Sequence, residues 1–133
     1  MTRIWHQSVN ELEHLQVYKK ALEDHGREVM GSEAELVVHG LPSGTYGGLS
    51  ATAALGNAYA YHRLLGCVIE NAIQAEREGY DAFVIGSFSE PFLREIRSAV
   101  DIPVASLTEA GLLVGCSLGR YIGLVSNAPA VQW

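Results

Sequence analysis

The chain has 133 residues, a length typical of one compact domain. Hydrophobic residues make up 48% of it and charged residues 18%, so the composition supplies a core and excludes a disordered protein. Nine Lys and Arg residues stand against fifteen Asp and Glu residues, which gives a formal net charge of −6. Because an acidic surface repels phosphate backbones, we expect no nucleic-acid partner.

The sequence also indicates a cellular compartment. Its first residues lack the pattern of a signal peptide, and two cysteines are too few for a disulfide framework. The uncharged stretch 47–61 contains Asn57 and two tyrosines, and it falls short of the ~20 apolar residues that span a bilayer. We therefore expect a cytoplasmic protein with no membrane partner.

Amphipathic segments predict four helices. The first is expected to begin with a capping box at Asn10 and Glu13 and to end at Gly26. The second is expected over residues 50–78, with an interruption near Gly56 or Gly66 and a stop at Gly79. The third is expected to follow a Ser89 cap with Pro91 in its first turn, and the fourth to run from a Thr108 cap to Leu118.

Short apolar segments between these helices predict strands over residues 3–7, 35–39, 81–86, 102–105 and 121–125. The alternation predicts an α/β fold, a flavodoxin-like three-layer lobe with an open parallel sheet and helices on both faces. In such sheets ligands bind beyond the carboxyl ends of the strands. The residues there are small and polar, and they are the candidate site: Gln7, Ser8, Gly86, Ser87, Phe88, Ser89, Thr108, Ser126 and Asn127.

The turn over residues 86–91 is the most informative part of this candidate site. The chain leaves a buried strand there and enters a helix, so free backbone amides could bind an anion such as a carboxylate. Gly86 would let a ligand approach the backbone, and Ser87 would project into the crevice. The alternative is that Ser87 and Ser89 only cap the helix that follows.

Several kinds of cofactor and metal site find no support in the sequence. It has neither a P-loop nor a dinucleotide fingerprint, and Lys19 and Lys20 lie on the first predicted helix, away from the strand ends where a pyridoxal cofactor would need a lysine. The histidines show no metal-ligand spacing, although His6 and His39 could meet at neighbouring strand ends. We expect no cofactor and no metal.

Several blocks of the sequence, among them RIWHQS at residues 3–8, GYDAFVIGSFSEP at 79–91 and LVSNAP at 124–129, occur in an order that resembles the aspartate/glutamate/hydantoin racemase superfamily, above all its hydantoin-racemase-like branch. The resemblance implies two α/β lobes with the substrate between them. It also implies a cofactor-independent enzyme in which a cysteine from each lobe removes or returns the α-proton. The substrate would be a small carboxylate, an amino acid or a hydantoin.

Two departures from the family pattern bear on activity. The cysteine position of the first lobe falls on Ser87, whose hydroxyl is a far weaker acid than a thiol. The resemblance makes residues 1–119 the first lobe and 120–133 the first strand of a second lobe that is otherwise missing. Neither Cys67 nor Cys116 matches a catalytic position, and both are expected to be buried and inert. We expect the chain alone to be impaired in proton transfer, with Ser87 at the catalytic position.

The sequence leaves three other interpretations of the chain open. The chain could be a non-catalytic module that binds small carboxylates, or a degenerate half-domain whose strand 121–125 pairs between chains. It could also be related to decarboxylases of the superfamily that use only a second-lobe cysteine. An exposed half-interface predicts a homo-oligomer in each case.

Overall fold

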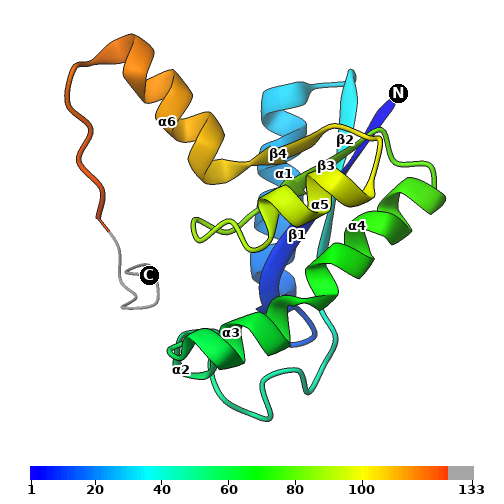
Figure 1. Ribbon diagram of the computed structural model, residues 1–133. Helices are drawn as coiled ribbons and strands as arrows, with labels where there is room; N and C mark the ends of the chain where they lie inside the picture. Colours follow the sequence, from blue (N-terminus) through cyan, green and yellow to red (C-terminus); the bar gives the residue numbers. More distant parts are fainter. Residues whose placement is uncertain (126–133) are drawn as a thin grey trace.

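The computed structural model describes residues 1–125 (Figure 1). The strands are β1 (Thr2–Glu11), β2 (Ala34–Leu41), β3 (Ala82–Ile85) and β4 (Val104–Ser106). The helices are α1 (Gln16–Met30), α2 (Ala51–Ala54), α3 (Ala58–Leu65), α4 (Cys67–Arg77), α5 (Leu93–Ala99) and α6 (Leu107–Leu118).

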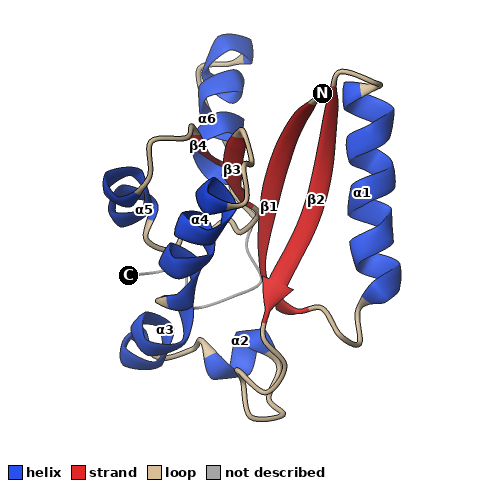
Figure 2. Cartoon of the chain, turned by 90° about the vertical axis from the view of Figure 1, so that its right-hand side faces the viewer, coloured by secondary structure: helices blue, strands red, loops and turns tan. Residues whose placement is uncertain are grey.

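The strands form one parallel sheet in the order β2-β1-β3-β4. After β2 the chain crosses over β1 to reach β3, so α1 lies on one face of the sheet while α4 and α5 lie on the other (Figures 1 and 2). The prediction of an α/β fold with an open parallel sheet and helices on both faces is confirmed.

The main core lies between the sheet and α4. Alternate residues of β1 and β3 point to this face, and Trp5, Phe83 and Ile85 are buried there. On α4 the residues that face them are small, and Ala72 and Ala75 are completely buried. These small side chains let the helix approach the sheet closely, so the carboxyl ends of β1 and β3 are placed on a rigid base.

Helix α1 differs from its prediction at both ends. The chain stays in β1 through Glu11, so Asn10 and Glu13 do not cap a helix. Gly26 is buried inside α1, where an added Cβ would lie 2.9 Å from the Leu36 side chain. That glycine allows close packing of α1 on β2, and the helix ends later, at Gly31 with a φ of 58°.

The predicted helix over residues 50–78 is broken at both of the suggested glycines. Gly56 separates α2 from α3, and Gly66 separates α3 from α4. The Asn57 side chain starts α3 by accepting hydrogen bonds from the N–H groups of Tyr59 and Ala60. Gly79 follows α4 with a φ of 76°, so the predicted stop is confirmed.

The caps predicted for the last two helices are wrong. α5 begins after Phe92, which has a φ of 59° and no capping side chain, so Ser89 lies outside the helix. α6 is capped by Ser106, whose hydroxyl accepts a hydrogen bond from the N–H of Glu109 at 2.9 Å. Thr108 lies inside α6, because β4 ends later than the sequence predicts.

The predicted strand over residues 121–125 is also wrong. These residues have no regular structure and are exposed, and among the described residues no strand runs beside them to complete a ladder. Figure 1 shows α6 projecting away from the sheet, and this helix buries none of its side chains. Ser126 and Asn127 lie outside the described residues.

Between residues 1 and 125 we find no helix whose length and apolar character would allow it to cross a membrane.

Candidate functional site

The turn after β3 lies at the carboxyl edge of the sheet, as predicted. Gly86 donates a backbone hydrogen bond of 2.9 Å to the carbonyl of Gln7, so the turn starts directly beside the end of β1. The residue before this glycine, Ile85, is completely buried. The position of the turn is therefore set by the interior of the sheet and not by the loop itself.

Ser87 and Ser89 face each other within the turn. Their hydroxyl oxygens are 3.0 Å apart, and both side chains are half-buried. Between residues 1 and 125, the backbone N–H groups of Ser87, Phe88 and Ser89 donate no hydrogen bond. Three successive amides are thus free to bind an oxygen atom of a ligand.

Side chains from two helices hold this turn. The Tyr61 hydroxyl on α3 donates to the carbonyl of Ser89 at 3.3 Å, and the Thr108 hydroxyl on α6 donates to the carbonyl of Phe88 at 2.6 Å. Burial raises the pKa of Tyr61, so this phenol stays neutral and keeps its proton for the hydrogen bond. The structure brings Thr108 to the predicted site, but its hydroxyl supports the backbone of the turn.

The sequence analysis missed Glu90, which has a φ of 48°. Its carboxylate accepts hydrogen bonds from the hydroxyl of Ser106 and from the N–H of Glu109, the latter at 2.8 Å. No sequence spacing reveals these contacts, because they join residues 16 and 19 positions apart. The first turn of α6 therefore already holds an anion, the protein's own carboxylate.

Glu109, in the first turn of α6, is the charged side chain next to this contact. Its side chain forms a two-point ion pair with Arg97, with N–O distances of 2.5 and 3.1 Å. The Arg97 guanidinium lowers the pKa of Glu109. This carboxylate is therefore charged and paired at neutral pH, which fits a structural role.

Gln7 and Ser8 lie in the second half of β1, and both residues are buried. The Gln7 side chain accepts hydrogen bonds from the indole N–H of Trp5 at 2.9 Å and from the Asn71 amide at 3.0 Å, and it donates to the Ser8 carbonyl. Ser8 is 2% exposed, and its hydroxyl accepts from the N–H of Asn10. The polar groups of both residues are therefore used inside the protein.

His6 and His39 do not meet. The His39 ring stacks on Trp5 with a centroid distance of 3.4 Å, and one of its nitrogens lies 3.2 Å from the Tyr80 hydroxyl. Burial lowers the pKa of His39 to about 4 and also lowers that of His6. Because His6 follows Trp5 in β1, its side chain is on the other face of the sheet, where it packs against Gly86.

Comparison with known proteins identifies the family. The family model for Asp/Glu/Hydantoin racemase matches residues 15–133. The chain belongs to this family. A hydantoin racemase from Pseudomonas sp. (strain NS671) is 32% identical over 65 residues, which are 49% of this chain and 26% of that protein.

A solved structure of similar fold is the allantoin racemase from Klebsiella pneumoniae. It superposes with a TM-score of 0.63 at 20% sequence identity, over 88% of this chain and 44% of that one. At this identity the likeness supports the fold alone. The chain thus spans about a quarter of the hydantoin racemase and less than half of the allantoin racemase.

Neither cysteine of this racemase-family chain lies at the turn. Cys67 is half-buried at the start of α4, burial raises its pKa, and its thiol donates to the Leu64 carbonyl. Cys116 is exposed on α6, so the prediction that it is buried is wrong. In the part of the chain that the structure describes, no group of three His, Cys, Asp or Glu side chains could hold a metal ion.

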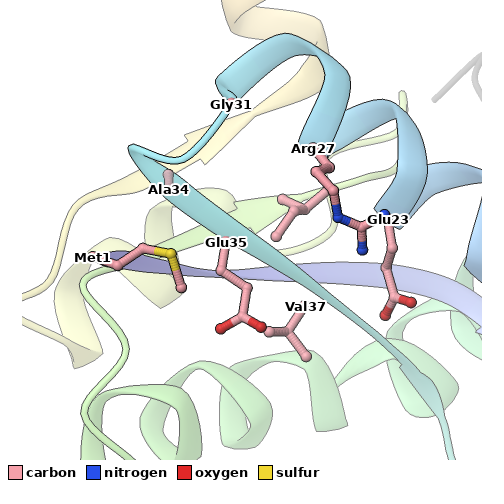
Figure 3. Close-up of a pocket in the computed structure, with 8 residues that line it drawn as sticks. Met1, Glu23, Arg27, Gly31, Ala34, Glu35 and Val37 are labelled. Carbon is pink, nitrogen blue, oxygen red and sulfur yellow. The ribbon is translucent and has the colours of Figure 1, made fainter.

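Among the pockets that the described residues form, two have a volume of about 330 Å³ each. The first lies where β1 and β2 begin, between Met1, Arg27 and Glu35 (Figure 3), at the end of the sheet opposite the turn. The second lies where these strands end, between Asn10, Tyr46 and Ser50. None of the residues that line this second pocket belongs to the candidate site predicted from the sequence.

Proposed function

We propose that this chain contributes a substrate-binding lobe to a cofactor-independent racemase that acts on a small carboxylate, an amino acid or a hydantoin. The observation that supports it most is the set of three unpaired N–H groups over residues 87–89 in a chain of the racemase family. Such groups can bind a carboxylate or imide oxygen and stabilise the negative charge that develops when an α-proton leaves.

Ser87 occupies the proposed catalytic position of this lobe, where the family resemblance implies a cysteine. Its hydroxyl is hydrogen-bonded to that of Ser89, and among the described residues no carboxylate, imidazole or amine makes a hydrogen bond to it. A hydroxyl without an activating base is a poor proton acceptor. We therefore propose that Ser87 and Ser89 bind substrate and that proton removal by this lobe is impaired.

The rest of the site would come from a second lobe. We propose that residues 1–119 form the first lobe and that residues 120–133, with Ser126 and Asn127, begin the second. A first lobe of this size is supported by the superposition in which 88% of this chain covers 44% of the allantoin racemase. A thiol from the second lobe would return the proton from the opposite side of the substrate carbon.

The test is exchange of the α-proton of amino acids and hydantoins for deuterium, followed by NMR. We expect no exchange with the chain alone, and exchange with the Ser87→Cys variant when the second lobe of a homologous racemase is supplied. Ser89→Cys is the matched control, because it places a thiol two residues away from the proposed position. Absence of exchange in every combination contradicts a racemase.

A binding function without chemistry is the second candidate. Two observations favour it. The Ser87 hydroxyl is hydrogen-bonded to that of Ser89, and neither cysteine, Cys67 or Cys116, belongs to the turn over residues 86–91. A thermal-shift series with amino acids and hydantoins separates the two functions, because saturable stabilisation without deuterium exchange indicates binding alone.

We further propose that the protein is a cytoplasmic homo-oligomer. The support for self-association is the apolar surface of α6, on which Leu113 is 68% exposed and Leu118 is 83% exposed. Light scattering during size-exclusion chromatography measures the mass directly. A monomer at all concentrations contradicts this part of the proposal.

A further inference from the structure

The second pocket has walls of two kinds. It lies between the end of β1, the start of α1 and the loop that joins β2 to α2. Its lining includes the largely apolar residues Leu15, Tyr46 and Leu49 and the polar residues Asn10, Glu11, His14 and Ser50. Its volume of about 330 Å³ is in the range that small ligands occupy.

Glu11 is the charged group that is held most firmly in this pocket. One of its carboxylate oxygens accepts a hydrogen bond from the N–H of Tyr46 at 2.6 Å, and the other accepts from the N–H of Gly44 at 3.0 Å. Each carboxylate oxygen can accept two hydrogen bonds, so each keeps one acceptor position. The backbone thus fixes a negative charge at the wall and leaves it able to receive N–H donors.

The neighbouring groups are also mainly acceptors. The Asn10 side chain donates through its nitrogen to the Ser8 hydroxyl, which leaves its carbonyl oxygen without a partner among residues 1–125. The Tyr46 hydroxyl donates to the Val9 carbonyl at 2.5 Å, and burial raises its pKa, so this phenol keeps its proton for that bond. No lysine or arginine lines the pocket to neutralise Glu11.

We infer that this pocket is a subsite for an amide or ureide group of a small ligand, and that Glu11 makes it reject carboxylates. The inference deepens the proposed function, since it assigns the chemical class of the substrate's substituent. A ligand N–H would bind the free acceptor positions of Glu11 and Asn10. A ligand carboxylate would meet a fixed negative charge with no lysine or arginine among the described residues that line the pocket.

L-Glutamine and L-glutamate are matched probes, because they differ only in the amide or carboxylate at the end of the side chain. Each is added to the full chain labelled with ¹⁵N, and the backbone amide signals are followed by NMR. The amides of Gly44 and Tyr46 report directly, because they donate to Glu11. We expect saturable shifts of these signals with glutamine and at least about tenfold weaker binding of glutamate.

Three substitutions test whether the charge of Glu11 or the shape of the pocket sets the preference for glutamine over glutamate. Glu11→Gln keeps the size of the side chain and is expected to bring the ratio of the two affinities close to one. Glu13→Gln changes the net charge equally but alters an exposed side chain that bonds the Ser43 hydroxyl outside the pocket, so the ratio should not change. Leu49→Trp, at a residue that is 61% exposed, should weaken glutamine binding by filling the pocket without loss of folding.

Several results would overturn the inference: equal binding of glutamine and glutamate, shifts that avoid the pocket, or equal effects of Glu11→Gln and Glu13→Gln. Absence of any shift with glutamine overturns it as well. Deuterium exchange tests the proposed function separately. Glutamine-selective shifts, with no exchange by Ser87→Cys in the presence of the second lobe, support the subsite and contradict racemisation. Exchange by that combination without these shifts supports racemisation and contradicts the subsite.

Discussion

The imidazole of His6 occupies the space that a side chain at Gly86 would need. A Cβ built on Gly86 overlaps two atoms of the ring. His6 lies in β1 and Gly86 directly follows the last residue of the neighbouring strand β3, so the two residues meet where the turn of the candidate site begins. A glycine is therefore required at this position by packing, in addition to any approach of a ligand.

We predict that Gly86→Ala destabilises the protein by about 1–3 kcal/mol, since the methyl group must displace a ring packed against the sheet. His6→Ala combined with Gly86→Ala should recover most of this loss, and urea denaturation of the four proteins of the cycle measures it. Gly111→Ala is the control, because nothing lies within 4 Å of that position. Additive effects of the His6 and Gly86 substitutions would contradict this packing.

Glu90→Gln tests whether the carboxylate holds the turn on α6. The charged acceptor of the Ser106 hydroxyl and of the Glu109 N–H is lost, so we predict a loss of about 1–2 kcal/mol and faster hydrogen exchange at the Glu109 amide. Glu95→Gln removes an equal charge from the exposed face of α5 and serves as the control. An unchanged exchange rate at Glu109 would show that the bond is not formed in solution.

Gln7→Ala tests whether Gln7 is structural. The substitution leaves the Trp5 indole and the Asn71 amide without their shared acceptor inside the protein, which costs about 2–4 kcal/mol. Gln74→Ala on the exposed side of α4 should change stability by less than about 0.5 kcal/mol. A stable Gln7→Ala protein with weakened ligand binding would instead support the original expectation of substrate contact.

We predict that His39 lowers the free energy of unfolding of the protein as the solution becomes acidic. Burial lowers its pKa from the ordinary value of 6.5 to about 4, so the folded protein holds the neutral ring. The stabilisation is complete above pH 6.5 and is lost as the pH falls through 4, because protons then bind the unfolded chain first. His39→Phe keeps a ring against Trp5 and should flatten this part of the profile. An NMR titration of His39 with a midpoint near 6.5 would contradict the prediction.

Local patterns predicted most of the elements. The apolar segments of β1, β2 and β3 were identified because their side chains alternate or lie in a continuous β-branched run. The breaks at Gly56 and Gly66 were identified because glycine weakens a helix. Residues 121–125 have the same local pattern, but a strand also needs a neighbour to pair with, and local sequence cannot supply that information.

The details of the site depend on contacts between distant residues. Gly26 looked like a helix stop, although its role is to let Leu36 approach. Tyr61 reaches the carbonyl of Ser89 across 28 residues, and no spacing rule predicts such a bond. Gln7 was predicted to bind substrate because the sequence places it near a strand end. The sequence does not show that the Asn71 amide donates a hydrogen bond to its side chain.

The central claim is that the amides over residues 87–89 bind the oxygen atoms of a small acid. Titration of the ¹⁵N-labelled chain with acetate tests it most directly, since these three N–H groups have no acceptor among the described residues. We predict saturable downfield shifts of the Ser87, Phe88 and Ser89 signals, while the Glu109 amide, already bonded to Glu90, stays unchanged. Signals of the turn that do not move at any acetate concentration, or that move only together with those of the whole surface, would contradict the account.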